Sequence, residues 1–426
     1  MFIMEAKKLS EVRDPNFRDE ISQKMCFHTE EGKFDLNYCL ACGTCAAACY
    51  FTDLVENHDP RKFMRKVALG LKDEVLNDRF VWLCNMCGRC TMHCPGKVPL
   101  PAVVRTVRGQ FGLTAPGRLQ EVADLHMRVG NQMEITEEEF METIEWMQEE
   151  LQEEFGDSSL TIPVNVEGAE ILFLPHPREI KYYPEDIKSW TKIFWNAKES
   201  WTLSSKAFDV TNFGLFNGRD DEAKKIMDFV VDEMRRLGVK RCVMTECGHG
   251  YWAFVWGKKV WYKEGEVPWE FEHMVGWMAN LIKTGKIKVD KTKNPYVVTI
   301  HDPCNTVRKG GLIEEGRYIL ENVAEKFVDM WPNREYNYCC GGGAGALPMG
   351  TVVKKERMAK GKLKADQMMA TGAEICCAPC HNCYDQLNDI NKEYNLGMKI
   401  KHLHHLVEHA LIWPEDGPRP KQEEEE

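Results

Sequence analysis

Two runs of cysteines near the N-terminus have the same spacing, with two, two and three residues between successive cysteines. They read CLACGTCAAAC, residues 39–49, and CNMCGRCTMHCP, residues 84–95. Thiolates at this spacing hold cubane [4Fe–4S] clusters. Zinc sites more often use paired cysteines than two copies of a four-cysteine run. The runs therefore predict two cubane clusters and the transfer of single electrons.

The order of the cysteines within each run predicts which cluster each one binds. Three closely spaced thiolates can bind three irons of one cluster, and the fourth, at the end of the run, binds the other cluster. We assign one cluster to Cys39, Cys42, Cys45 and Cys94, and the other to Cys84, Cys87, Cys90 and Cys49. Gly43 and Gly88 allow the backbone to pass close to each cluster.

A third group of cysteines lies in the C-terminal third, where apolar runs meet three loops. Its members are Cys304, Cys339, Cys340, Cys380 and Cys383. Because the ends of parallel strands converge on one crevice, these loops could bring five thiolates together. The adjacent Cys339 and Cys340 could bind neighbouring irons, and the glycines after them leave space for a substrate sulfur. A structural zinc or a redox disulfide is the alternative at this group.

Three further residues are candidates for the chemistry of this third group. Cys247 and His249, in the segment TECGHG, are either an additional ligand and a proton donor or packing residues. His301 stands three residues before Cys304, at the end of an apolar run. It is either a proton carrier or a hydrogen-bonded structural residue.

Other cysteines and histidines have a structural interpretation. Cys376 and Cys377 end an apolar run and are expected in the core, although Cys377 also forms a C-x-x-C with Cys380. His405 and His409, near the C-terminus, are four residues apart and could share a metal on one helix face. We favour packed or solvated helix histidines at these positions.

The apolar pattern predicts the elements that position the cysteines. Residues 50–83 have helical spacing, and an acidic helix is expected after Thr136 as its N-cap. From residue 168, short apolar runs alternate with helical stretches. The runs are AEILFLP, RCVMTECG, NPYVVTIHDP and AEICCAPC. This alternation favours an α/β domain with mostly parallel sheets.

The α/β part also contains an internal repeat. ILFLPHPRE aligns with VVTIHDPCN, TNFGLFNG with YCCGGGAG, and TECGHGY with APCHNCY, in the same order. In the first copy, Arg178 and Asn212 are among the residues that replace cysteines. Cys247, opposite Cys380, is the cysteine that the first copy keeps. Since one cysteine cannot hold a cluster, only the second copy is expected to bind one.

Composition excludes several function classes. The chain has 426 residues and a net charge of −11, which argues against nucleic acid as a partner. It lacks both the long apolar run of a membrane helix and the apolar core of a signal peptide. We therefore expect a cytoplasmic chain. In a reducing compartment, its 18 cysteines are more often metal ligands than disulfides.

The order of these motifs resembles the HdrD-like iron–sulfur proteins of heterodisulfide reductases, which carry a CCG domain, over roughly residues 21–412. The segments TECGHG and NFG resemble the branch with the DsrK and TmcB proteins of membrane redox complexes in sulfur-metabolising microbes. The resemblance implies an α-helical ferredoxin domain followed by a pseudo-duplicated α/β CCG (cysteine-rich) domain. It also implies three [4Fe–4S] clusters, of which the unusual one on the third cysteine group is catalytic.

With this resemblance the chain divides into six segments. They are a flexible N-terminus (1–20), a ferredoxin domain with two clusters (21–110), an acidic helical linker (111–167), a degenerate first CCG half (168–295), a second CCG half with the catalytic cluster (296–412) and a disordered tail (413–426).

The resemblance implies an oxidoreductase that passes electrons from a membrane partner through two cubanes to a cluster that reduces a disulfide or trisulfide. Its implied partners are a cytochrome b-type membrane subunit and other complex subunits, which would place the chain on the inner face of the membrane. The implied substrate is a small cysteine-tailed sulfur carrier protein or a low-molecular-weight disulfide. The alternative is a pure electron-transfer subunit similar to glycolate oxidase iron–sulfur subunits, which two intact CCG halves would favour.

Overall fold

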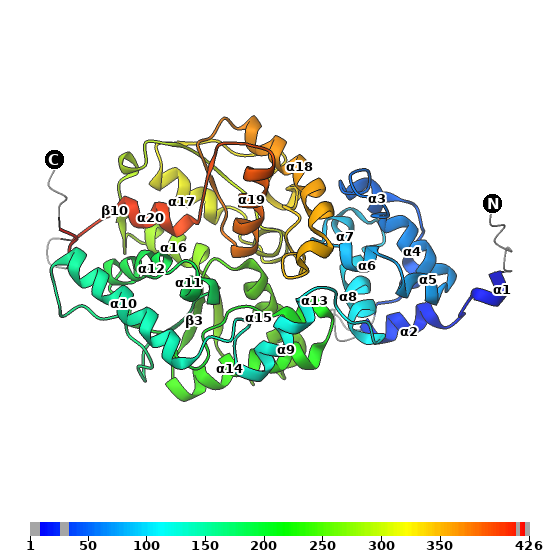
Figure 1. Cartoon of the computed structure of the whole chain (residues 1–426), viewed down its shortest axis with the longest axis horizontal. Coiled ribbons are helices and arrows are strands. Elements are labelled where there is room, and N and C mark those ends of the chain that lie inside the picture. The colour runs from blue at the N-terminus through cyan, green and yellow to red at the C-terminus, as the bar shows by residue number, and fades with distance from the viewer. Residues whose placement is uncertain (1–8, 26–33, 415–417, 422–426) are drawn as a thin grey trace.

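The cysteine-rich N-terminal part folds into short helices. The computed structural model describes residues 9–25, 34–414 and 418–421. The helices of this part are α1 (Leu9–Val12), α2 (Phe17–Lys24), η2 (Leu36–Tyr38), α3 (Thr44–Ala48), α4 (Pro60–Leu69), α5 (Lys72–Leu76), α6 (Phe80–Leu83), α7 (Arg89–His93) and α8 (Leu100–Gln110). They form the blue and cyan lobe in Figure 1. The prediction of helices between the two cysteine runs is confirmed.

The two ends of the chain are described only in part. Residues 1–8 of the expected flexible N-terminus, Cys26 and most of the expected disordered tail lie outside the described residues. Within residues 9–25, Phe17 and Ile21 of α2 are fully buried, and α2 packs against α8. Helix α2 therefore belongs to the packed N-terminal lobe.

Two helices connect this lobe to the α/β part. They are α9 (Leu119–Val129) and α10 (Glu137–Phe155). Thr136 caps α10 as predicted, in a capping box: its hydroxyl accepts from the Glu139 amide, and the Glu139 carboxylate accepts from the Thr136 amide. The apolar face of α10 packs on α12 (Glu185–Asn196).

Two four-stranded parallel sheets form the α/β part. The first has the order β2-β1-β3-β4 and the second the order β7-β6-β8-β9. Their strands are β1 (Ile171–Leu174), β2 (Trp201–Thr202), β3 (Arg241–Met244), β4 (Glu270–His273), β6 (Val297–Ile300), β7 (Lys326–Phe327), β8 (Ile375–Cys377) and β9 (Lys399–Lys401). A short antiparallel ribbon pairs β5 (Lys288–Val289) with β10 (Leu411–Ile412). The prediction of an α/β fold with parallel sheets is confirmed.

Helices cover both sheets. They are α11 (Pro177–Lys181), α12, α13 (Phe213–Asn217), α14 (Asp220–Leu237), α15 (Gly248–Trp261), α16 (Met274–Lys283), α17 (Glu315–Val323), α18 (Lys354–Ala370), α19 (His381–Glu393) and α20 (Leu403–Ala410), with short turns η3 (Lys291–Lys293), η4 (Asn305–Lys309), η5 (Arg334–Tyr336) and η6 (Gly350–Val352). Among the described residues, no helix is both long and apolar enough to cross a membrane.

One buried arginine joins the N-terminal lobe to segments beside each of the two sheets. The Arg108 guanidinium on α8 donates hydrogen bonds to five main-chain carbonyls. The acceptors are Val81, Trp82, Cys84, Phe216 and Ala344, at 2.8–3.4 Å. Three of them lie in the N-terminal lobe, one in α13 beside the first sheet and one in the loop after the Cys-Cys pair. Burial lowers the pKa of Arg108 to about 10, so it remains charged at neutral pH.

We predict that Arg108→Met destabilises the whole chain. Methionine leaves several buried carbonyls without a donor, which costs more than about 3 kcal/mol in total. The apparent midpoint of thermal unfolding, followed anaerobically by far-UV circular dichroism, should fall by about 3 °C or more. The matched control is Arg128→Met on α9, whose exposed side chain pairs with Glu134 and should change stability by less than about 1 kcal/mol. Equal midpoints for the two variants would contradict the role of Arg108.

Candidate metal centres

The two cysteine runs fold in the same way locally. Each contains a non-glycine residue and a glycine with positive φ, two residues apart. They are Ala41 and Gly43 in the first run, at 50° and 95°, and Met86 and Gly88 in the second, at 48° and 83°. A short helix, α3 or α7, begins directly after each glycine, and the two helices pack together. Each run therefore curls around a small space with its cysteines facing inward.

Each of these spaces is a cavity lined by four cysteines that the spacing groups together. The first cavity is lined by Cys39, Cys42, Cys45 and Cys94, and the second by Cys49, Cys84, Cys87 and Cys90. Cys90 also reaches the wall of the first cavity. In both cavities the last cysteine of one run stands with the first three cysteines of the other. This is the arrangement that two cubanes with exchanged fourth ligands require.

The electrostatics of these thiols fit metal ligands. Burial raises the pKa of Cys45 to about 11 and that of Cys49 to about 12, so neither ionises alone at neutral pH. A bound metal deprotonates such thiols and replaces the lost solvation. The exposed Cys42 differs, because a hydrogen bond with Thr44 lowers its pKa. All described cysteines are free, so no disulfide competes for these sulfurs.

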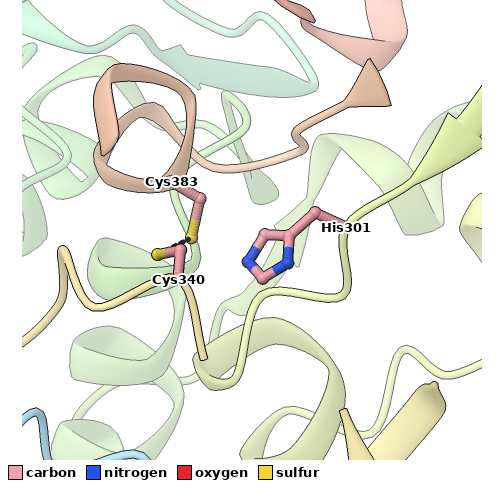
Figure 2. Close-up of side chains that lie close together, drawn as sticks. All are labelled: His301, Cys340 and Cys383. Carbon is pink, nitrogen blue, oxygen red and sulfur yellow. Dashed lines mark hydrogen bonds between the residues drawn. The ribbon is translucent and has the colours of Figure 1, made fainter. Parts of the chain in front are cut away.

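The third cysteine group converges at the ends of β6 and β8. The Sγ atoms of Cys340 and Cys383 lie 3.5 Å apart, and a ring nitrogen of His301 lies within 4.8 Å of both (Figure 2). Cys304 is hydrogen-bonded to Cys339, and Cys380 to Cys383. The five thiols, all buried, thus form one connected cluster from three loops.

Hydrogen bonds among these thiols favour ionisation at two of them. Bonds with Cys339 and Cys383 lower the pKa of Cys340 to about 5, and a bond with Cys383 lowers the pKa of Cys380 to about 6. Two buried lysines of α18, Lys360 and Lys364, supply positive charge nearby. Burial lowers the pKa of Lys360 to about 8 and also lowers that of Lys364, while neighbouring thiolates oppose both shifts. A set of close, ionisable thiols beside cations fits an anionic metal–sulfur group.

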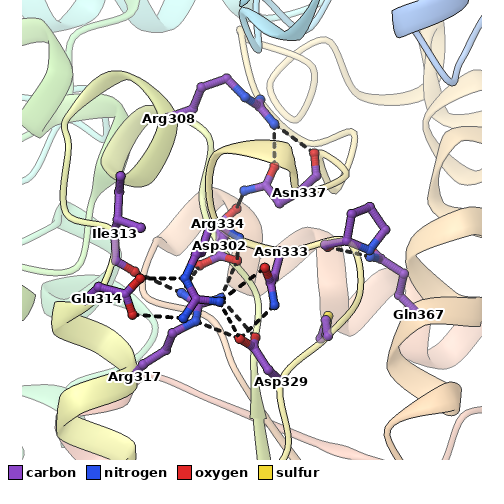
Figure 3. Close-up of polar contacts among 12 residues, drawn as sticks. Asp302, Arg308, Ile313, Glu314, Arg317, Asp329, Asn333, Arg334, Asn337 and Gln367 are labelled. Carbon is purple, nitrogen blue, oxygen red and sulfur yellow. Dashed lines mark hydrogen bonds and ion pairs between the residues drawn. The ribbon is translucent and has the colours of Figure 1, made fainter.

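A polar network fixes the loops that carry Cys304 and Cys339 (Figure 3). The buried Asp302 carboxylate accepts from both Nη atoms of Arg317, at 2.8 and 2.9 Å, and from the Arg334 amide at 2.7 Å. Arg317 also donates to Asp329. Asn337 donates to the Asp302 carbonyl and accepts from Arg308. The loop before the Cys-Cys pair is therefore tied to the loop that leads into Cys304.

The second cavity and the third cysteine group adjoin each other. Phe51, Cys304 and Cys339 form one buried cluster, against which Cys49 and Cys87 pack. Asn85 donates through Nδ2 to the carbonyls of Gly341 and Gly343, at 2.8 and 3.0 Å. Arg308 donates to the Cys87 carbonyl at 2.9 Å, and the Cys339 amide donates to the Tyr50 hydroxyl.

Two family models match this chain, and each covers one set of cysteines. A model for a 4Fe-4S dicluster domain matches residues 35–98, which contain both cysteine runs. A model for a cysteine-rich domain, CCG, matches residues 298–388, which contain the third group. A relative across most of the chain is the Hdr-like menaquinol oxidoreductase iron–sulfur subunit 2 of Archaeoglobus fulgidus. It is 25% identical over 91% of this chain and 82% of its own length.

Two heterodisulfide reductase proteins match shorter parts. The D-type subunit of the dihydromethanophenazine:CoB–CoM heterodisulfide reductase of Methanosarcina mazei is 30% identical over 45% of this chain and 46% of its own. The C-type subunit of the H₂:CoB–CoM heterodisulfide,ferredoxin reductase of Methanothermobacter thermautotrophicus is 34% identical over 25% of this chain and 56% of its own length. These matches support an HdrD-like CCG iron–sulfur protein. The resemblance based on the cysteine motifs is confirmed at this level.

The other candidate residues of this HdrD-like protein lie beside the third group. Cys247 is buried before α15 and accepts a hydrogen bond from the Gly250 amide. Burial, and next the charge of the nearby Cys380, raise the pKa of Cys247. Both ring nitrogens of His249 have partners: the Asn212 main chain at 2.8 Å and the Asn382 side chain at 3.2 Å. His249 thus reaches the segment between Cys380 and Cys383 through Asn382 and makes no hydrogen bond to a thiol among the described residues.

Other expectations have a clear structural outcome. Cys376 and Cys377 are fully buried in β8, as expected for core residues. His405 and His409 do not share a partner, because His405 contacts Asp186 and His409 contacts Asn294. Sequence reasoning missed the polar residues at the junction, such as Asn85 and Lys360, since neither belongs to a recognisable spacing.

We predict that iron loss in double variants reveals which cysteines share a cluster. Cys39→Ala should remove one cluster, about four irons. Cys39→Ala/Cys94→Ala should lose no more, because both residues line the first cavity. Cys39→Ala/Cys49→Ala should lose about eight irons, because Cys49 lines the second. Iron and acid-labile sulfide on anaerobic protein are the readout. The reverse pattern would assign each four-cysteine run to a cluster of its own.

Proposed function

We propose that this chain is an electron-transferring oxidoreductase subunit with three [4Fe–4S] clusters, one of which reduces a disulfide- or trisulfide-type bond of a thiol substrate. The first and second cavities would each hold a cubane, and the third cysteine group the catalytic cluster. The observation that carries the proposal is the packing of Cys304 and Cys339 against Cys49 and Cys87. Electrons can pass between groups whose ligands are in contact without a further carrier.

Electrons would enter at the first cavity. Cys42 is exposed there, and the neighbouring Leu40 and Tyr38 expose 74% and 65% of their surface. An exposed apolar patch beside a cofactor ligand favours a protein partner at that face. The relatives named as complex subunits support such a partner. We propose a cytochrome b-type membrane subunit, which would hold the chain peripherally on the inner face of the membrane.

Reduction of a disulfide consumes two electrons and two protons and yields two thiols. When bound, the cubanes would supply single electrons, and the catalytic cluster would supply the iron that binds the substrate sulfur. His301 would hold and deliver a proton at a ring nitrogen. That nitrogen lies beside Cys340 and Cys383, and neither ring nitrogen has a hydrogen-bond partner among the described residues. Cys247 and His249 would form the opposite wall and keep Asn382 and Cys380 in place.

A cavity of about 510 Å³ beside the turn after Cys304 is our candidate substrate site. Its lining is mostly apolar and includes Phe216 and Trp252. Its charged lining residues are the cations Arg105, Arg308 and Lys309 and one carboxylate, Glu335. The Lys309 ammonium lies 5.5 Å from the centre of the Trp252 ring, and the charges of Lys309 and the Cys304 thiol interact. Apolar walls with adjacent cations favour a thiol substrate that carries carboxylate, sulfonate or another anionic group.

The repeat in the sequence fits a duplicated α/β half. Both sheets place the first strand of each half between the second and the third. The first pair of aligned segments contains β1 and β6, the second pair follows β2 and β7, and the third pair follows β3 and β8. We propose that the first half descends from a cluster-binding half that lost its cysteines. Asn212, at one of the positions aligned with the Cys-Cys pair, now caps α13 and accepts from the Leu215 amide.

We predict that Cys340→Ala abolishes disulfide reduction and Cys87→Ala does not. Reduced methyl viologen and 2-hydroxyethyl disulfide serve as donor and acceptor. Each variant should lose about four irons, because each removes a ligand of one cluster. Only the first removes the cluster that contacts the substrate, and viologen can bypass the lost cubane. Full activity in Cys340→Ala would refute the catalytic assignment and favour the pure electron-transfer role.

We predict that Lys309→Met weakens the use of anionic disulfides selectively. The KM for dithiodiglycolate, a dianion, should rise about tenfold, since a hydrogen bond to a charged group contributes about 1.5 kcal/mol. The KM for neutral 2-hydroxyethyl disulfide should change less than about twofold, and this serves as the internal control. If both KM values rise together, Lys309 shapes the cavity without recognising charge.

A further inference from the structure

A cluster of metal-ligating side chains separate from the three cysteine groups lies where α12, α19 and α20 meet the end of β3. Its members are Asp186, Glu246, His381, His402 and His404. None exposes more than 4% of its surface. Every ion-pair partner of Asp186 and Glu246 among the described residues is a histidine. Neither buried carboxylate thus pairs with a lysine or arginine among the described residues; apart from imidazoles, Glu246 accepts from the main-chain amides of Leu403 and His404.

Glu246 orients all three histidines in the same sense. Nδ1 of His404 lies 2.9 Å from Glu246 Oε1, and Nδ1 of His402 lies 3.5 Å from Oε2. Nδ1 of His381 lies 3.0 Å from the Glu246 main-chain carbonyl. Metal-binding histidines characteristically donate their second N–H to a carboxylate or a carbonyl, which leaves the other nitrogen free to bind. Here the free nitrogen is Nε2 for His381 and His404, whereas neither ring nitrogen of His402 makes a hydrogen bond among the described residues.

The Nε2 atoms are directed toward Asp186. Nε2 of His404 lies 3.8 Å from Asp186 Oδ1, and Nε2 of His381 lies 3.9 Å from Oδ2. The ligand atoms of Asp186, His381 and His402 all lie within 4.8 Å of one another. His405 fixes the carboxylate from outside, with Nε2 at 2.6 Å from Oδ1.

These atoms have no hydrogen-bond partner among the described residues. The unpartnered atoms on the Asp186 side are Nε2 of His381, His402 and His404 and Oδ2 of Asp186, and Nδ1 of His402 also lacks a hydrogen-bond partner. Nε2 of His381 does lie 3.2 Å from a Glu179 carboxylate oxygen, but without hydrogen-bond geometry. Four buried polar atoms that face one another without partners are unfavourable unless something binds between them.

We propose that Asp186, His381, His402 and His404 bind one divalent transition-metal ion, and that the ion is zinc. Three imidazole nitrogens and one carboxylate oxygen complete the closed four-ligand set of a structural zinc site. At zinc–ligand distances of about 2.0–2.1 Å, neighbouring ligand atoms lie about 3.4 Å apart. The two distances that involve Asp186, 3.8 and 3.9 Å, therefore need to shorten by about half an ångström. His404, which lies in a group with Asp186 and His405, must also move closer to His381 and His402. The ion's charge would offset the carboxylates of Asp186 and Glu246.

The ion would join the two α/β halves beside the third cysteine group. Asp186 comes from α12 in the first half, whereas the three histidines come from α19 and from the start of α20 in the second. His381 directly follows Cys380 and begins α19, which also carries Cys383. The site would thus hold the first turn of α19 in place whether or not the third group reduces disulfides.

The test is metal analysis of the full-length, anaerobically purified holoprotein, by inductively coupled plasma mass spectrometry together with acid-labile sulfide. We expect about one zinc per chain in the wild type, and close to none in Asp186→Asn and in His404→Ala, with sulfide unchanged. The matched control is His409→Ala on the same helix, whose ring contacts Asn294 and which should keep the zinc. Unchanged sulfide would show that each variant has folded and holds its clusters.

Added metal gives a second readout that needs no variant. Wild-type protein stripped of zinc by a chelator should take up about one Co²⁺ and develop visible d–d bands, and His409→Ala should do the same. If the wild type instead contains one iron beyond the cluster iron, and both ligand variants lose it, the site exists but binds iron(II) and not zinc. No non-cluster metal in the wild type together with no Co²⁺ bands, or zinc retained in Asp186→Asn, would overturn the proposal.

Discussion

A buried thiolate needs positive charge or hydrogen-bond donors close to it, because desolvation of an uncompensated charge is very costly. This constraint explains the arrangement around the cysteines. The chain as a whole is acidic, with a net charge of −11, yet cations gather at the cysteine cavities. Lys360 and Lys364 stand four residues apart on one face of α18. The charge of Lys360 interacts with thiols of the second cavity, and the charge of Lys364 interacts with thiols of the third cysteine group.

The same constraint accounts for the position of α18 between the N-terminal lobe and the second sheet. Lys360 donates to the Leu83 carbonyl and, at 2.9 Å, to Asn85 Oδ1, and Asn85 in turn donates to Gly341. One lysine thus ends a chain of hydrogen bonds that begins at the Cys-Cys-Gly loop. Removal of any link would leave a charge or an amide buried without a partner. The cysteine groups and the contact between α18, the N-terminal lobe and the Cys-Cys-Gly loop therefore stabilise one another.

The sequence was sufficient where chemistry imposes a spacing. The four-cysteine runs predicted which sulfurs line each cavity, because a cubane constrains neighbouring ligands to fixed offsets. The apolar runs predicted β1, β3, β6 and β8, the two central strands of each sheet. The edge strands β2, β4, β7 and β9 were missed, because strands of two to four residues are too short for a recognisable apolar pattern, and β4, β7 and β9 also contain charged residues. Likewise, helical periodicity could not find the pair His402 and His404, since His402 precedes α20 with extended backbone angles.

Arg108 has a consequence for the evolution of this family of chains. Its five acceptors are main-chain carbonyls, which every amino acid supplies. As hydrogen-bond acceptors, the residues at those positions can therefore change while the arginine cannot, although Cys84 is also constrained as a predicted cluster ligand. Such a position would be strongly constrained in an alignment and yet show no correlated partner. Methods that find contacts from pairs of coupled positions would pass over the residue that joins all three parts of the molecule.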